Sequence, residues 1–281
     1  MRTRALICVL LLSPAAALAE GPAGLDAKTR RALIEAVCEG ESKRPEYGDG
    51  IAACHRPSYA GGEEGSDDDV NLGPVRLGSF TRPGSKQALV NLDGCGTSSS
   101  NSCGTVLLER DGPGWKRVYL DKSGTFSCPQ TFRVPNGRDL LICEHWTLSG
   151  YAAMWWVSFG PKAAETHDLF EPLFSNKVYD GCAPGKLMFS LEPGKPLRKD
   201  VDSDGRPDLA LRVEGRRWTP ARASDCPEQL SDSDARLKKH SRPEVFELEF
   251  IVGAPGLQPT PATVKALAAI EALQARNYAD R

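Results

Sequence analysis

Residues 200–209, with the sequence DVDSDGRPDL, carry four aspartates spaced around one glycine. Carboxylates this close repel one another unless a cation neutralises them. Calcium takes carboxylate and carbonyl oxygens as ligands, and a glycine supplies the sharp turn that lets such side chains converge. The pattern predicts a calcium loop, and a polar Asp-rich turn without an ion is the alternative. The expected ligands are the side chains of Asp200, Asp202, Asp204 and Asp208 and the main-chain carbonyl of Arg206.

The residues that follow distinguish this loop from an EF-hand. An EF-hand needs a glutamate at its twelfth position and a helix on each side. The twelfth position here is Leu211, and residues 209–213 continue as the apolar run LALRV. The loop is therefore expected to lead into a β-strand.

Residues 200–209 resemble the calcium loop of the FG-GAP, or VCBS-type, repeat found in integrin-like β-propellers. The resemblance implies a loop between the first two strands of a blade, with the same five ligands. Two degenerate copies align with it by a glycine before an apolar strand, so that Gly84 and Gly137 correspond to Gly205. Positions equivalent to the first three aspartates hold Ser79, Thr81 and Pro83 in one copy and Phe132, Val134 and Asn136 in the other. Neither copy can hold calcium in the same way.

Glu144 and His145 are the best-placed pair for acid–base chemistry, because they lie side by side near several aromatic residues. Neighbouring residues on a strand point to opposite faces, which argues against a working pair. The sequence lacks the common motifs of serine hydrolases, zinc proteases, phosphate-binding loops and dinucleotide-binding folds. The expectation leans towards a protein that is not an enzyme, although a site assembled from distant residues stays open.

Three of the five tryptophans lie in residues 143–159, which read as a hairpin that turns at Ser149–Gly150. Exposed flat rings there would offer a platform for a carbohydrate or a peptide. Rings that fill the sheet core are the favoured alternative. The platform candidates are Trp146, Trp155 and Trp156, and either Trp155 or Trp156 is the better candidate for exposure, because adjacent strand residues face opposite sides.

The N-terminus has two arginines, a short apolar run and small residues up to Ala19, which predicts a signal peptide over residues 1–19. Its removal takes two of the 35 basic residues, leaving 33 against 37 acidic residues and a net charge of −4. No basic patch for nucleic acid and no segment long enough to span a membrane is found in the sequence. The chain is expected to be exported, to the periplasm or the extracellular space.

Eight cysteines follow the predicted signal peptide, and an even number in an exported chain indicates disulfides. They are Cys38, Cys54, Cys95, Cys103, Cys128, Cys143, Cys182 and Cys226. Sequence alone leaves 105 connectivities open for eight cysteines. Pairing in sequential order is the prediction, because each bond then closes a loop within one structural unit.

Two helices are expected to flank a middle region of strands and turns. The first covers about 26–39, with Asp26 as its N-cap, and the second about 261–276, with Pro261 in its first turn. Between them, short apolar runs alternate with Gly, Pro, Asp and Ser. The predicted fold is mainly β, a single disulfide-tied domain over residues 20–281 whose antiparallel units resemble a partial or irregular β-propeller.

These features predict an exported, non-enzymatic calcium-binding β-domain that acts as a binding or structural module at or outside the cell surface. Its partner would be a protein or a glycan. The alternative is a secreted hydrolase that acts on a polysaccharide or another envelope polymer, with the tryptophan-rich hairpin as its substrate platform.

Overall fold

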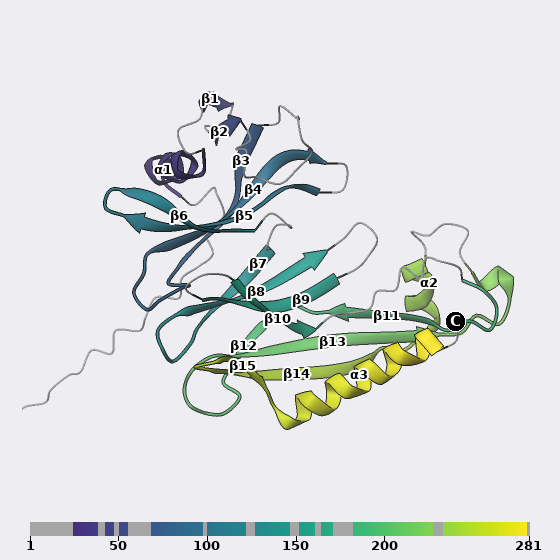
Figure 1. The fold of residues 1–281 in the computed structure, drawn as a ribbon. Coiled ribbons are helices and arrows are strands. Elements are labelled where there is room, and N and C mark those ends of the chain that lie inside the picture. Colours follow the sequence, from purple (N-terminus) through teal and green to yellow (C-terminus); the bar gives the residue numbers. More distant parts are fainter. Residues whose placement is uncertain are drawn as a thin grey trace, which may run out of the picture.

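The computed structural model describes the backbone over residues 25–38, 43–47, 51–55, 69–97, 100–121, 127–146, 152–160, 164–170, 182–226 and 233–279. Three antiparallel sheets follow one another along the chain (Figure 1). Sheet A contains β1 (Lys43–Tyr47), β2 (Ile51–His55), β3 (Asp69–Gly78), β4 (Gln87–Thr97), β5 (Ser100–Asp111) and β6 (Gly114–Asp121). Sheet B contains β7 (Ser127–Arg133), β8 (Asp139–Trp146), β9 (Ala152–Phe159) and β10 (Ala164–Phe170). Sheet C contains β11 (Met188–Pro193), β12 (Leu197–Lys199), β13 (Asp208–Trp218), β14 (Glu244–Gly253) and β15 (Gly256–Pro259).

The strands of sheets A and B pair in the order in which they occur in the chain, as do β13, β14 and β15 of sheet C, so these parts are antiparallel meanders. In sheet C both β11 and β12 pair with β13, each along a different half of that strand. The mainly-β, antiparallel prediction is therefore confirmed.

Sheet B lies between the other two sheets, and alternate side chains along its strands face sheet A and sheet C. Leu141 and Val157 face sheet A, in a core that includes Leu89 and Leu107. Their neighbours point the opposite way, and Ile142 joins a core with sheet C. Because both faces of sheet B are buried, its strands carry apolar residues at consecutive positions.

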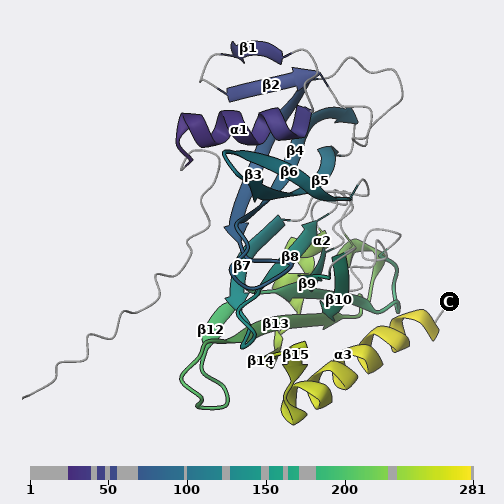
Figure 2. The same ribbon diagram turned by 60° about the vertical axis from the view of Figure 1, so that its left-hand side comes forward.

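Helix α1 (Ala27–Cys38) covers the face of sheet A that points away from sheet B (Figure 2). Asp26 caps it as expected, since Asp26 Oδ1 accepts a hydrogen bond from Thr29 N at 2.8 Å. The pKa of Asp26 is lowered mainly by a hydrogen bond from the Thr29 hydroxyl and, to a smaller extent, by the bond from the Thr29 backbone N–H. Leu33, Ile34 and Val37 form the buried stripe of the helix.

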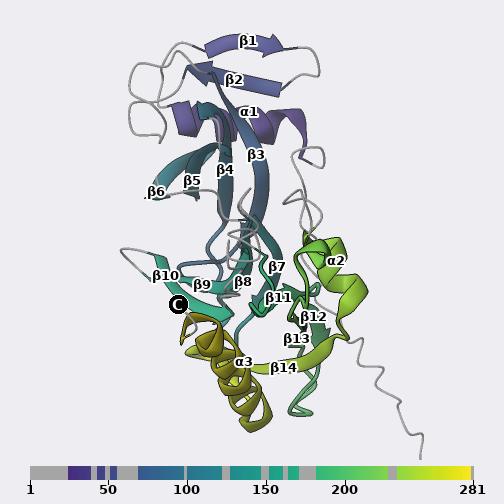
Figure 3. The same cartoon turned by 90° about the vertical axis from the view of Figure 1, so that its right-hand side faces the viewer.

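Helix α3 (Pro261–Ala279) packs against β14 and β15, with Pro261 at its first position as expected (Figures 1 and 3). A third helix, α2 (Ser233–His240), was not expected from the sequence. It packs against sheet C, where Leu237 contacts the core around Met188. No helix in the described part of the chain is long and apolar enough to cross a membrane.

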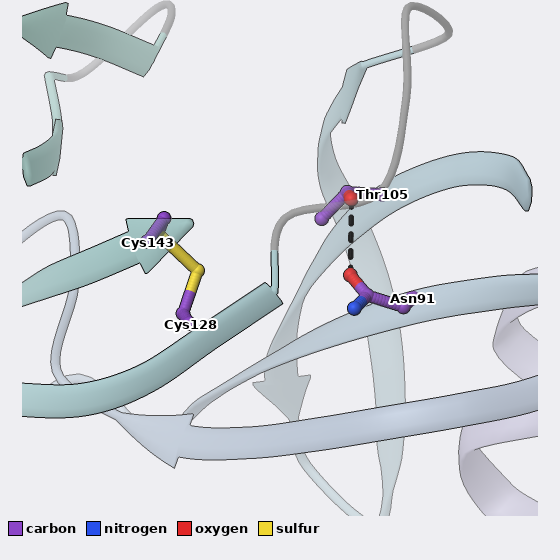
Figure 4. The surroundings of a disulfide bond; sticks show 4 residues. All are labelled: Asn91, Thr105, Cys128 and Cys143. Atoms are coloured by element: carbon purple, nitrogen blue, oxygen red, sulfur yellow. Dashed lines mark hydrogen bonds between the residues drawn. A yellow bond between two sulfur atoms is a disulfide. The ribbon is translucent and has the colours of Figure 1, made fainter. Parts of the chain in front are cut away.

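Two disulfides in the described residues follow the predicted sequential order. Cys128–Cys143 joins β7 to β8 and lies near the hydrogen-bonded side chains of Asn91 and Thr105 in sheet A (Figure 4). Cys182–Cys226 links the segments that flank β11 and β13. Cys38 is also disulfide-bonded. The side chains of Cys54, Cys95 and Cys103, like residues 1–24, lie outside the described residues.

Candidate cation site

The aspartate-rich segment forms an exposed loop that joins β12 to β13. Its backbone takes a left-handed conformation at Ser203 (φ 64°) and at Gly205 (φ 82°). Asp202 Oδ1 accepts a hydrogen bond from Asp204 N, and Asp200 Oδ2 accepts one from Gly205 N, both at 3.1 Å. These local bonds turn the chain back on itself, so that the first aspartates approach the start of β13.

Three of the four predicted carboxylates come together in this loop. Oxygens of Asp200, Asp202 and Asp208 all lie within 4.8 Å of one another. Two oxygens bound to the same calcium ion are at most about 5 Å apart, because each lies about 2.3–2.6 Å from the ion. The three carboxylates therefore fit one divalent cation of the kind that prefers oxygen ligands.

Asp208 differs from the other two carboxylates in its surroundings, because it is 2% exposed. Its Oδ2 accepts a hydrogen bond from Val201 N at 3.0 Å, and its Oδ1 accepts one from Val252 N at 2.7 Å. Asp208 thus fixes the loop to the end of β14. Each carboxylate oxygen has a second lone pair, so these bonds leave acceptor capacity for a cation.

Asp204, the fourth predicted ligand, points elsewhere. Its Oδ2 accepts hydrogen bonds from the Arg206 guanidinium, including one from Nε at 2.7 Å. The Arg206 side chain lowers the pKa of Asp204, and Asp204 in turn raises the pKa of Arg206. The predicted cluster of four side chains is therefore a cluster of three beside an Asp204–Arg206 ion pair.

The aspartate-rich loop before β13 shares two features with the turns before β4 and β8, which align with it in the sequence through Gly84 and Gly137. Each strand follows a glycine with positive φ: 73° at Gly84, 81° at Gly137 and 82° at Gly205. Each strand also begins with a buried polar residue. These residues are Gln87, Asp139 and Asp208, with exposures of 1%, 5% and 2%.

The side chains of Gln87 and Asp208 close their turns in the same way, because each accepts a hydrogen bond from a backbone N–H at the start of its turn. Gln87 Oε1 accepts a hydrogen bond from Phe80 N at 2.8 Å. In the sequence alignment Phe80 corresponds to Val201, whose N–H donates to Asp208. The two turns therefore use one arrangement, with a neutral amide in sheet A and a carboxylate in sheet C.

In sheet B the buried carboxylate has a cationic partner. Arg133 Nε lies 2.7 Å from Asp139 Oδ1, and Arg133 Nη1 donates to the carbonyl of Gly137 at 3.0 Å. Asp139 also accepts a hydrogen bond from Ser79 N of the neighbouring turn at 2.6 Å. A guanidinium therefore supplies positive charge beside the buried carboxylate at the start of β8, which lies two residues after its glycine, whereas Asp208 lies three residues after Gly205.

The described tryptophans of the predicted platform, Trp155 and Trp156, pack on two different cores. Trp156 is 8% exposed and belongs to the core between sheets B and C, so it has no free face for stacking and the core alternative holds for it. Trp155 is partly buried and packs on the core between sheets A and B. The side chains of Trp146 and His145 lie outside the described residues.

A small cavity lies between sheets B and C. It is lined by residues that include Arg138, Asp139, Ser158 and Gly256, and its volume is about 10 Å³. This space fits about one water molecule. It is too small for a substrate.

Comparisons with known proteins find no similar chain: no protein-family model, no curated protein and no solved structure matches.

Proposed function

We propose that this chain is an exported calcium-binding β-domain that acts as a binding or structural module for a protein or glycan partner. Asp200, Asp202 and Asp208 would hold the ion, which would neutralise their charge and fix the loop between β12 and β13. The two described disulfides are compatible with an oxidising compartment.

The observation that carries the calcium proposal is the different charge balance at the three strand starts. Sheet A has the neutral Gln87, and sheet B has Asp139 with the guanidinium of Arg133. Sheet C has the buried Asp208 with two further carboxylates close by, while the nearby Arg206 pairs with Asp204 instead. Three converging carboxylates repel one another, and Arg206 is hydrogen-bonded to Asp204, so a cation from outside the chain would offset charge that Arg206 compensates only in part.

The same comparison supports an internal repeat of the FG-GAP or VCBS type. Its three units would be sheets A, B and C, with a glycine-led turn before the fourth strand of sheet A, the second of sheet B and the third of sheet C. Only the third unit would keep calcium ligands.

A thermal melt in EDTA and in about 2 mM calcium tests the proposal. With a dissociation constant of about 0.1 mM, at the stronger end for extracellular modules, calcium should add roughly 1.8 kcal/mol of stability. The melting temperature should then rise by several degrees. The double variant Asp200→Asn/Asp202→Asn should lose this shift.

Asp204→Asn is the matched control, because it removes one negative charge from the same loop but leaves the three-carboxylate cluster unchanged. It should retain the calcium shift. If the wild-type protein shows no shift up to about 10 mM calcium, the calcium-binding proposal is wrong.

A further inference from the structure

Asp208 connects the candidate cation site to a second part of sheet C. One of its oxygens accepts a hydrogen bond from Val201 in the loop, and the other accepts one from Val252 near the end of β14. Val252 pairs with Leu257 across the β14–β15 hairpin, whose turn is formed by residues 253–256. The carboxylate that would bind the ion therefore also fixes the strand that leads into this turn.

The turn itself meets sheet B at Trp156. Gly256 has a φ of 135°, and a Cβ placed on it would lie 2.5 Å from Cη2 of Trp156 and 2.9 Å from Cζ2. The indole ring thus lies directly against the backbone of Gly256, where any larger residue would clash. Trp156 comes from β9, so this contact is a direct junction between sheets B and C.

We propose that calcium binding in the loop is coupled to this junction, so that the bound ion strengthens the contact between the 253–256 turn and Trp156. This inference rests on the calcium binding proposed above. The coupling runs from Asp208 to Val252 and through the hairpin to Gly256.

The physical reason is the double role of the Asp208 carboxylate. Without a cation, the repulsion among three nearby carboxylates is relieved when Asp208 moves away from Asp200 and Asp202. Such a movement lengthens the 2.7 Å hydrogen bond from Val252 N to Asp208 and loosens the end of β14. A bound cation favours the position of Asp208 in which both of its backbone hydrogen bonds are made.

Thermodynamic linkage turns this into a measurable prediction. If calcium strengthens the Gly256–Trp156 contact, that contact must strengthen calcium binding by the same factor. A substitution that disturbs the contact, at residues that are not ligands, should therefore weaken calcium affinity without changing any ligand.

The experiment is a calorimetric calcium titration of the folded wild-type protein and of Gly256→Ala. The variant should bind calcium at least about five-fold more weakly, the lower end of typical coupling factors. Gly78→Ala is the matched control, because a Cβ there would meet the ring of Phe80 at 2.7 Å in the A–B junction. It imposes a similar clash on an aromatic ring but should leave the calcium dissociation constant within about two-fold of wild type.

Trp156→Phe provides a second test, which remains valid if Gly256→Ala does not fold. It removes the indole atoms that touch Gly256, so it should weaken calcium binding and abolish the calcium-dependent change in tryptophan fluorescence that we expect of the wild type. Wild-type affinity in both variants would refute the coupling and leave the calcium site intact. If the wild-type protein binds no calcium, the proposed function and this inference both fail.

Discussion

Asp93 shows how a single residue can oppose the stability of the sheet that contains it. It lies in β4 opposite Asn71, and its carboxylate covers the backbone of Gly73, where a Cβ would come within 2.4 Å of Asp93 Oδ2. Burial raises the pKa of Asp93 above its ordinary value of 3.8. The folded protein therefore binds a proton at this carboxyl more readily than the unfolded chain does.

Asp93→Asn should stabilise the protein at neutral pH. Because the folded-state pKa is the higher one, the stability that Asp93 contributes is complete below about pH 3.8 and is lost as the pH rises through the raised value. At pH 7 the wild type bears the cost of a half-buried charge, which an amide avoids. Urea unfolding at pH 7 should give a higher midpoint for the variant, and the difference should shrink towards pH 3.5.

The exposed Asp111, in the β5–β6 hairpin, provides the matched control. Asp111→Asn should leave the urea midpoint nearly unchanged at both pH values. A lower midpoint for Asp93→Asn at pH 7 would show that the Asp93 carboxylate is stabilising, contrary to this account.

For single residues, the sequence predicted where the candidate site lies better than it predicted which side chains contact one another there. Asp200, Asp202 and Asp208 converge because a short loop with a glycine brings them together. Asp204 was expected among them, but it pairs with Arg206 two residues away, and sequence spacing does not distinguish a cation ligand from a local ion pair. The role of Arg133 beside Asp139 was missed, although the two are only six residues apart, because it depends on the tight turn at Gly137.

Thr263 is the residue that joins helix α3 to the edge of sheet C. Strand β15 pairs with residues 250–253 of β14, so Glu249 lies beyond the end of β15. The buried Thr263 hydroxyl takes the place of a strand there: its Oγ1 accepts a hydrogen bond from Glu249 N at 2.6 Å and donates one to Glu249 O at 2.8 Å. The helix thus satisfies backbone groups that the sheet leaves open.

Thr263→Val should destabilise the protein by about 2 kcal/mol, because the partly buried Glu249 N–H loses its acceptor. Thr263→Ser keeps the hydroxyl and should cost less than about 1 kcal/mol. Guanidinium unfolding of the two variants measures this difference. A larger loss in Thr263→Ser than in Thr263→Val would mean that the methyl group of Thr263, and not its hydroxyl, secures the helix.

Elements with local signals were predictable from the sequence. The Asp26 cap marks α1, Pro261 marks α3, and apolar runs after turns mark β4, β8 and β13. Helix α2 was missed because seven of its eight residues, SDARLKKH, are polar or small; among its described side chains Leu237 joins the core and His240 stacks on Trp218. That helix depends on a contact with sheet C, which no local pattern contains.

At the scale of the whole molecule, the stack of sheets ends differently on its two sides. Helix α1 covers the apolar outer face of sheet A. The outer face of sheet C carries charges on β12, β13 and β14 instead, with Arg212 opposite Glu247 and Lys199 paired with Glu249, and α2 packs on Met188 of β11. The sequence predicted antiparallel β units but not their order in space, because the pattern of a strand with two buried faces does not identify which sheet covers each face.

Sheet B should make the three sheets unfold together, because its strands contribute to a separate core on each face. Leu92→Ala, in the core under α1, and Leu211→Ala, in the core between sheets B and C, should each cost about 2–5 kcal/mol. Each variant should shift one single transition, with coincident curves from tryptophan fluorescence and far-ultraviolet circular dichroism. Strands β4 and β5 transmit the effect of Leu92→Ala, since their opposite faces place Leu89 and Leu107 against sheet B. Two separated transitions in Leu92→Ala would show instead that sheet A and α1 form an independent folding unit, and the single-domain interpretation of residues 20–281 would be wrong.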